Sequence, residues 1–577
     1  MPTRSATLAL YASLAAAVGA ATCADTTRPT PPAAAAVHGS ADTALTFRVN
    51  TAQRHSISRF IYGVNAATDA SAWAGAAPPA EVTLNRMGGN RLSAYDWETN
   101  YSNAGSDYQF HNDQYLSAST VPGEAVRVRA AATFARGAAF LATVPMLPYV
   151  AGDACNCDVG TSDAARDARL AAHFRPNTAT RGNAPGGNAP TGPGAPVAQD
   201  EFVRWATRTF PGATADTARR LMFSLDNEPD AWHATHKEIQ SDHGDNPAAP
   251  RLQTYDGFID TTIAYARAVK RAAPDALVFG PALATYTGIL TLGRYPADDP
   301  VYGNWHAHPF VDVYLDRLRA AESAEGHRLL DVLDVHWYPA AGTSGGPITN
   351  DYAPQDSAAV EARVQAPRSL WDSSYDEHSW VSGVTAGPVR LLPRLGDEIA
   401  AHYPGTRLAV SEYYFGRAGD ISGGIAQADV LGVFGREGVY AAALWPQANP
   451  WAPPYAGSGA LAYAYAFGAF RMYLNYDGAG GRFGDIGVDA TASDPAAASV
   501  YASLDTLGRV VLVAINKRRT AQAARIVVAH PTALHAARVF TLTAAGPTRA
   551  PDLTLPAGNA FSYTMPPLSV STLVLTP

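Results

Sequence analysis

Charged residues are scarce in this chain. Only 16% of its 577 residues are Asp, Glu, Lys or Arg, against about 25% in an average globular protein. The 43 basic residues are outnumbered by 51 acidic ones, which gives a formal net charge of −8. A protein that binds nucleic acid or an acidic membrane surface needs a basic face, so we expect no nucleic-acid partner. Apolar residues make up 47% and aromatic residues 10%, which argues against a disordered chain and predicts a sizeable folded core.

Long apolar runs are also missing, except near the N-terminus. Residues 6–21 are apolar and Ala-rich, follow the positive Arg4, and are too few to span a bilayer comfortably. We interpret residues 1–24 as a signal peptide and residues 25–44, rich in Pro and Ala, as an unstructured linker. We therefore expect an exported monomer without a membrane span, either extracellular or periplasmic. Cys23 is a candidate lipid-attachment site on a bacterial envelope, and plain cleavage is the alternative.

Cysteine is nearly absent. Beyond Cys23 the sequence contains only Cys155 and Cys157, separated by one residue. A zinc site needs two further ligands, which this neighbourhood lacks. In an oxidising compartment the two cysteines either pair with each other or stay free, and the sequence leaves both outcomes open.

Eight short apolar runs alternate with segments of helical spacing. The helical segments include residues 255–272 and 309–324, where apolar residues recur roughly every 3.6 positions. Strands that alternate with helices predict a parallel sheet, and eight such units predict a (β/α)8 TIM-like barrel. We place this barrel at residues 59–470, with the low-complexity segment 175–199 as a mobile insertion loop. The eight runs are residues 60–64, 82–87, 138–147, 221–225, 276–279, 329–336, 407–410 and 439–444.

The last hundred residues have a different pattern. Short alternating runs at residues 500–504, 510–516, 524–529, 537–542 and 570–575 predict an all-β sandwich over residues 471–577. Residues 45–58 have the same strand-like appearance before the barrel begins. We expect them to contribute an additional strand to the sandwich.

Two glutamates follow barrel strands, where catalytic residues of such barrels lie. Glu228 comes after the fourth run and Glu412 after the seventh, and aromatic residues surround both. Retaining glycoside hydrolysis needs one carboxylic acid that protonates the leaving oxygen and one carboxylate that attacks the anomeric carbon, about 5–5.5 Å apart. Strands four and seven face each other across an eight-stranded ring, so this pair fits the requirement.

Several motifs in one order resemble glycoside hydrolase family 44. The resemblance covers about residues 45–577. It is carried by Asp226-Asn227-Glu228-Pro229 with Trp232 and Thr235-His236, by residues 86–91 (Arg-Met-Gly-Gly-Asn-Arg), by residues 335–339 and 363–368, and by the long run from Ser411 to Trp445.

This resemblance implies a secreted, retaining endo-β-1,4-glucanase that acts on β-glucans such as xyloglucan or cellulose. It also implies a barrel joined to a β-sandwich built from both chain ends, with Glu228 as acid/base and Glu412 as nucleophile. One alternative is an endohydrolase of another β-1,4 polysaccharide, mannan or xylan. The other alternative is a non-catalytic carbohydrate-binding protein on the same fold.

Around this pair we expect residues that hold the charges and the sugar. Arg91 is the candidate cationic neighbour of Glu412, and Asn227 the candidate partner of the sugar 2-hydroxyl. Flat aromatic side chains stack on the apolar faces of glucose rings. The remaining candidate substrate-binding residues are Tyr95, Trp97, His336, Trp337, Tyr338 and Trp445.

We expect that no cofactor is required. The resemblance implies a structural calcium ion, for which Glu98, Asp153 and Asp158 offer hard oxygen ligands. Their spacing does not form a calcium-binding loop.

Overall fold

The computed structural model describes residues 45–69, 71–181, 195–240, 254–293, 304, 306–450, 452, 454–455, 457–555 and 559–577. The predicted signal peptide, Cys23 and the whole predicted linker lie outside these residues, as does the middle of the low-complexity segment, residues 182–194. Across the described ranges, no helix is both long and apolar enough to cross a membrane.

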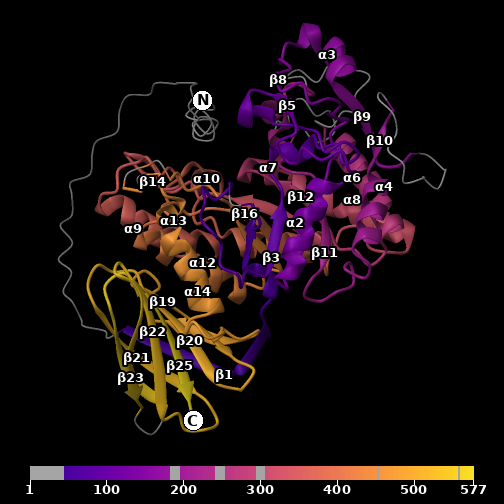
Figure 1. Ribbon diagram of the computed structural model, residues 1–577. Helices are drawn as coiled ribbons and strands as arrows, with labels where there is room; N and C mark the ends of the chain where they lie inside the picture. Colours follow the sequence, from indigo (N-terminus) through magenta and orange to yellow (C-terminus); the bar gives the residue numbers. More distant parts are fainter. Residues whose placement is uncertain are drawn as a thin grey trace.

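Eight parallel strands close into a barrel in the order β11-β12-β13-β16-β17-β2-β3-β6 (Figure 1). Each strand overlaps one of the eight predicted runs, so the predicted barrel is confirmed. The strands are buried on both faces, which is why they appear in the sequence as continuous apolar runs. Their bounds are β2 (Gly63–Asn65), β3 (Leu84–Met87), β6 (Ala139–Val144), β11 (Leu221–Leu225), β12 (Val278–Leu283), β13 (Val332–Trp337), β16 (Arg407–Tyr413) and β17 (Ala441–Leu444).

Helices connect the strands and cover the barrel. The predicted helix 255–272 is α6, where Thr254 accepts a hydrogen bond from the Gly257 amide at the first turn and Phe258, Ile259 and Ile263 are buried. The larger helices are α2 (Glu124–Ala135), α3 (Arg166–His173), α4 (Gln199–Thr209), α6 (Tyr255–Ala272), α8 (Phe310–Glu325), α9 (Ser357–Gln365), α11 (Leu391–His402), α12 (Ile421–Arg436) and α14 (Ala464–Leu474). Shorter ones are α1 (Asn90–Ser93), α5 (Trp232–Thr235), α7 (Tyr286–Thr291), α10 (Trp380–Val384) and α13 (Gly459–Ala462).

A separate nine-stranded sheet lies below the barrel in Figure 1. The N-terminal strand β1 (Leu45–Ser56) runs antiparallel to β18 and parallel to β21, so both chain ends build this domain. Its nine strands form one continuous hydrogen-bonded sheet in the order β23-β22-β25-β20-β19-β18-β1-β21-β24. The other strands are β18 (Ile486–Ala492), β19 (Ala498–Leu504), β20 (Val510–Asn516), β21 (Gln522–Ala529), β22 (Ala536–Thr543), β23 (Gly546–Thr554), β24 (Ala560–Met565) and β25 (Ser569–Thr576).

Strand β20 joins the two domains through its alternating side chains. Val510 and Leu512 belong to the apolar core of the sheet, whereas Val511 and Val513 pack into the core that includes the barrel. Because successive side chains of a strand point to opposite faces, a continuous apolar run at this position serves two cores at once.

The low-complexity segment differs from the predicted mobile loop at both ends. Arg175 lies in β9 (Phe174–Thr178), which pairs with β10 (Val197–Ala198) and β7 (Tyr149–Ala151) in a small sheet. The Arg175 guanidinium is buried and contacts Asp96 at 2.6 Å and Glu98 at 2.8 Å. These ion pairs join residues about 80 positions apart, which local composition cannot reveal.

A second small sheet contains β4 (Ser102–Asn103), β5 (His111–Asp113) and β8 (Cys157–Asp158), and β14 (Gly342–Thr343) pairs with β15 (Gly346–Pro347). Cys155 and Cys157 form a disulfide bond at the edge of this region. The pair that the sequence left open is therefore bonded.

Candidate active site

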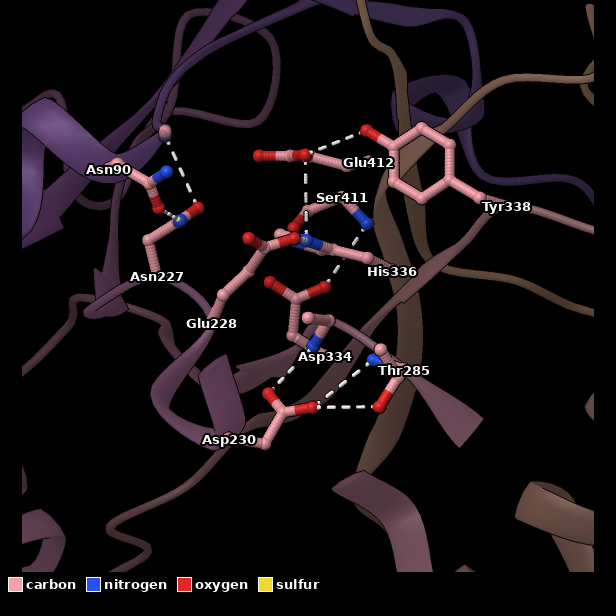
Figure 2. Close-up of polar contacts among 12 residues, drawn as sticks. Asn90, Asn227, Glu228, Asp230, Thr285, Asp334, His336, Tyr338, Ser411 and Glu412 are labelled. Carbon is pink, nitrogen blue, oxygen red and sulfur yellow. Dashed lines mark hydrogen bonds and ion pairs between the residues drawn. The ribbon is translucent and has the colours of Figure 1, made fainter. Parts of the chain in front are cut away.

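Four ionisable side chains converge at the carboxyl ends of the barrel strands. Arg86 lies on β3, Glu228 follows β11, His336 lies on β13 and Glu412 on β16. One carboxylate oxygen of Glu228, one of Glu412 and a ring nitrogen of His336 all lie within 4.8 Å of one another. All four residues are at most 4% exposed. Figure 2 shows the two carboxyl groups facing each other with the imidazole ring beside them.

Glu412 is surrounded by hydrogen-bond donors. The Arg86 Nη1 atom lies 2.5 Å from Glu412 Oε1, and the Tyr338 hydroxyl donates to Oε2 at 2.9 Å. A buried carboxylate needs such a partner because water cannot solvate it. The guanidinium and the phenol therefore hold both carboxyl oxygens of Glu412 in a fixed position.

A β-bulge directs Glu412 toward the barrel axis. Along the β13–β16 ladder, Val335 is opposite Val410 while the next residue, His336, is opposite Glu412, so Ser411 is the additional residue. The Ser411 amide donates instead to Asp334 Oδ1 at 3.1 Å, as Figure 2 shows. Asp334 is fully buried, and this burial raises the pKa of its carboxyl. Asp334 thus supports the bulge that presents the second glutamate.

Arg86 occupies the position that the sequence assigned to Arg91. Its Nη1 also donates to Asn65 Oδ1 at 3.1 Å and its Nη2 to Asn227 Oδ1 at 2.7 Å. A Cβ atom on Gly88 would lie 2.2 Å from the guanidinium, so the glycine leaves the room that Arg86 occupies. The assignment of Arg91 as the cationic neighbour is wrong, because its guanidinium pairs with Asp113 at 2.6 Å. The sequence did carry a signal for Arg86, because it lies inside an apolar run that predicts a buried strand. A buried arginine needs a charged or polar partner, which indicates a role for this residue.

Glu228 has a strained backbone and a buried side chain. Its φ of 49° lies in the left-handed region, which non-glycine residues adopt rarely and often at functional sites. Its amide donates to the Ala282 carbonyl at 2.9 Å, which ties this turn to the end of β12. Burial raises the pKa of Glu228 to about 7, although the positive charge of Arg86 opposes the shift. Near neutral pH this carboxyl therefore holds its proton in a substantial fraction of molecules.

Asp230 anchors the same turn from below, as Figure 2 shows. Its carboxyl accepts hydrogen bonds from the Ala284 amide at 2.8 Å and from the Thr285 amide at 3.2 Å. Burial and the nearby Glu228 raise the pKa of Asp230 to about 7. Asp230 therefore connects the Glu228 turn to the segment after β12.

His336 lies between the two glutamates. Its Nδ1 atom is 2.9 Å from Glu228 Oε1 and 3.5 Å from Glu412 Oε2. Burial lowers the pKa of His336 to about 4, so the ring is neutral at pH 7. The Nε2 atom is buried and has no hydrogen-bond partner among the described residues. We assign the single ring proton to Nδ1, because both carboxyl groups face that atom and an unpaired buried acceptor is more common than an unpaired N–H.

Comparisons with known proteins agree with this geometry. The family model of glycoside hydrolase family 44 matches residues 101–341. Endoglucanase A of Paenibacillus lautus is 35% identical over 546 residues, which cover 92% of this chain and 72% of that protein. A family 44 xyloglucanase from Paenibacillus polymyxa, solved with xyloglucan, is 35% identical with a TM-score of 0.82, and the match covers 93% of this chain and all of that one.

The chain belongs to glycoside hydrolase family 44. It is therefore a glycoside hydrolase, and a purely carbohydrate-binding role is set aside. A further relative, the β-mannanase/endoglucanase A of Caldicellulosiruptor saccharolyticus, is 34% identical over 481 residues. That match covers 79% of this chain but only 33% of the relative, so this chain corresponds to one part of that longer protein.

The predicted aromatic platforms of this family 44 hydrolase divide into two groups. Tyr338 and Trp445 are partly exposed at the barrel mouth, and a Cβ on Gly89 would lie 2.9 Å from the Trp445 ring. Tyr95 and Trp97 are at most 2% exposed and lie in the hydrophobic core, so they offer no face to a sugar. Trp337 is also in the core, at 3% exposure. The prediction of Tyr95 and Trp97 as platforms is corrected: sequence reasoning cannot tell a core aromatic from a surface one without the depth of each position.

Asn227 lies where the sequence placed it, beside Glu228 and in contact with the arginine that holds Glu412. Its Oδ1 accepts hydrogen bonds from Arg86 and from the Gly89 amide at 3.2 Å, which fixes the orientation of the side-chain amide. The Asn227 side-chain nitrogen makes one long hydrogen bond of 3.5 Å to Asn90 Oδ1. Figure 2 shows this contact.

The predicted calcium ligands do not come together. Glu98 is already paired with Arg175 and Arg181, and Asp153 contacts His173 Nδ1 at 2.7 Å. Asp158 is exposed and accepts a hydrogen bond from the Gly160 amide. Within the described part of the chain, no group of side chains close enough to share an ion contains Glu98, Asp153 and Asp158 together. These residues do not fit a calcium site.

Proposed function

We propose that this family 44 hydrolase is a secreted, retaining endo-β-1,4-glucanase that cleaves β-glucans such as xyloglucan by double displacement. The observation that carries the proposal is the distance of at most 4.8 Å between carboxylate oxygens of Glu228 and Glu412. Retaining enzymes hold their two carboxyl groups about 5–5.5 Å apart, whereas inverting enzymes need about 6.5–9.5 Å to admit a water molecule.

In the first step Glu412 is the nucleophile. Its carboxylate attacks the anomeric carbon while the protonated Glu228 delivers its proton to the leaving glycosidic oxygen, so one C–O bond forms as the other breaks. Arg86 and Tyr338 hold Glu412 in place for this attack. Asn227 is placed to donate to the sugar 2-hydroxyl, a bond that strengthens in the transition state.

In the second step Glu228 has lost its proton and acts as a base. It removes a proton from a water molecule, whose oxygen attacks the anomeric carbon and releases Glu412 as a carboxylate. The Nδ1–H group of the neutral His336 donates a hydrogen bond to Glu228 Oε1 and keeps its proton, which leaves Oε2 to carry the catalytic proton. Because burial keeps His336 uncharged at pH 7, the ring adds no positive charge beside Glu228.

The names of the relatives support a β-glucan substrate. One relative is an endoglucanase and one solved neighbour is a xyloglucanase. The name of a third relative includes β-mannanase as well as endoglucanase, which supports mannan as a second candidate substrate. Glucan and mannan differ at one hydroxyl of each sugar, and the catalytic pair would be the same for both.

A reducing-sugar assay on xyloglucan, carboxymethylcellulose, glucomannan, mannan and xylan tests the substrate. We expect the highest kcat/KM on xyloglucan or carboxymethylcellulose, with a rapid loss of viscosity that indicates cleavage within the chain. Preferential hydrolysis of pure mannan or xylan would contradict the glucanase proposal. Export is tested separately, by expressing residues 1–577 in a bacterial host and finding the processed protein outside the cytoplasm.

A further inference from the structure

A hollow lies among segments that follow the barrel strands, and its lining does not include the two glutamates. It has a volume of about 400 Å³, within the range of about 300–1,000 Å³ of small-molecule sites. Its walls come from three segments, represented by Tyr352, Arg417 and Tyr455. These segments follow β13, β16 and β17, so they continue from the strand ends that carry Tyr338, Glu412 and Trp445. In Figure 1 the labelled elements next to these segments, β14, α9 and α13, lie to the left of the barrel.

The three segments are held together by one buried carboxylate. Asp351 Oδ1 accepts hydrogen bonds from the Arg417 amide at 2.9 Å and from the Tyr414 hydroxyl at 3.0 Å. Its Oδ2 accepts a hydrogen bond from the Asn449 amide at 3.0 Å. Asp351 therefore bonds to the segments after β16 and β17 while belonging to the segment after β13. The hollow is a preformed feature, and ligand binding would not have to order these segments.

Its walls combine an exposed aromatic ring with polar groups. Tyr352 is 59% exposed, yet its hydroxyl is fixed by the Asn449 side-chain amide at 2.9 Å. Asp420 is partly exposed, and its Oδ1 accepts hydrogen bonds from the amide and the hydroxyl of Ser422 at the start of α12. Gln355 lines the same wall, and its side-chain oxygen is buried with no hydrogen-bond partner among the described residues. An aromatic face next to carboxylate and amide groups matches a pyranose ring, which has apolar C–H faces and a rim of hydroxyls.

The hollow is also closely packed behind this wall. A Cβ atom on Gly419 would lie 2.3 Å from the Leu461 carbonyl oxygen and 2.6 Å from the Tyr455 ring. Tyr455 itself is only 3% exposed, and the Arg417 guanidinium lies 5.8 Å from its ring centre. The polar groups of the wall are therefore supported by packed side chains, which a specific sugar site needs.

We propose that this hollow binds a pyranosyl unit of the same polysaccharide chain whose backbone is cleaved at Glu228 and Glu412. The inference rests on the proposed glucanase function and adds a distant sugar-binding site to it. Two sources share this chemistry: a glucosyl unit of the backbone, and a sugar that branches from the backbone. An endo-acting enzyme gains from such a site because a contact far from the scissile bond holds a long chain in place.

The test compares Tyr352→Ala with wild type on three substrates. These are xyloglucan, an unbranched carboxymethylcellulose, and a short aryl β-cellobioside that extends over few sugar units. We expect kcat/KM on polymer to fall about tenfold, mainly through KM, while the aryl β-cellobioside is hydrolysed as by wild type. Loss on both polymers identifies a backbone unit, and loss on xyloglucan alone identifies a branch. Tyr352→Phe keeps the ring and should retain at least half of the wild-type kcat/KM.

Leu507→Ala serves as the matched control, because Leu507 is 76% exposed on the sheet domain and should change nothing. Unchanged kcat/KM on both polymers in Tyr352→Ala would overturn the proposal, as would an equal loss on the aryl β-cellobioside. A wild-type enzyme that cleaves no β-glucan would instead overturn the proposed function. The two failures are therefore distinguishable.

Discussion

Within the nine-stranded sheet, strand β20 alternates its side chains between two apolar cores, whereas the barrel mouth gathers ionisable side chains away from water. The sheet follows a simple rule, in which burial of apolar area stabilises the fold. The barrel mouth does not follow this rule, because a buried charge destabilises the fold unless it has a partner. Several buried polar atoms at the mouth have no hydrogen-bond partner among the described residues. The sheet therefore contributes stability, whereas the barrel mouth gives up stability for chemistry. Changes at the mouth should therefore reduce activity, and changes in the sheet should reduce stability.

The largest expected effect is at the nucleophile. Glu412→Gln keeps an acceptor for Arg86 but cannot form the glycosyl ester, so kcat/KM should fall on the order of 10⁴-fold, about 5 kcal/mol of transition-state stabilisation. Thermal unfolding should remain cooperative, with the protein folded at the assay temperature. Turnover within tenfold of wild type would remove Glu412 from the nucleophile role.

The acid residue should show its role in the pH profile. Burial raises the pKa of Glu228 to about 7, so kcat/KM on polymer should decline as pH rises above about 7, where the proton is lost. Glu228→Ala should lose roughly 10²–10⁴-fold on polymer but far less on an aryl glycoside whose leaving group needs no proton. The alkaline decline should disappear in this variant. Equal losses on both substrates, or a persisting decline, would contradict the assignment.

Two arginines provide a matched pair at the mouth. Arg86→Lys replaces a planar fork that contacts Glu412, Asn65 and Asn227 with a single ammonium, so we expect a loss of about 10²-fold in kcat. Arg91→Lys should change kcat less than threefold, because its partner is Asp113. Steady-state kinetics on one polymer compares them directly. The reverse ranking would restore Arg91 as the cationic neighbour.

The smallest effect on activity is expected in the sheet. Ile526 on β21 is fully buried in the sheet core, so Ile526→Ala should lower the free energy of unfolding by about 2–5 kcal/mol. Its kcat at 25 °C should stay within twofold of wild type. Denaturant unfolding and a kinetic assay on the same preparation check both points. A large loss of kcat with unchanged stability would remove the distinction between the two regions.

The same contrast explains what the sequence could predict. The eight barrel strands and most strands of the sheet were predictable because buried strands require apolar runs that are visible locally. Strand β23 was missed because only a few of its side chains are even partly buried, so it carries no apolar signal.

At the candidate active site, the positions of Glu228 and Glu412 were predictable because residues that follow parallel barrel strands meet at one end of the barrel. Arg86 was not chosen, since its role depends on contacts with residues 141 and 326 positions away. Asp334 was missed because its function, supporting the bulge at Ser411, exists only once β13 and β16 are paired. The depth of Tyr95 and Trp97 was hidden for a similar reason: the side chains that cover Trp97, including Phe202 and Trp205, are distant in the sequence.

The stereochemistry of the first product tests the central claim most directly. Proton NMR can follow the anomeric signals of a cello- or xyloglucan oligosaccharide during the first minutes of hydrolysis, before mutarotation. Two carboxyl groups this close predict that the β-anomer appears first and the α-anomer grows only later. Initial release of the α-anomer would contradict double displacement and require a water molecule between Glu228 and Glu412.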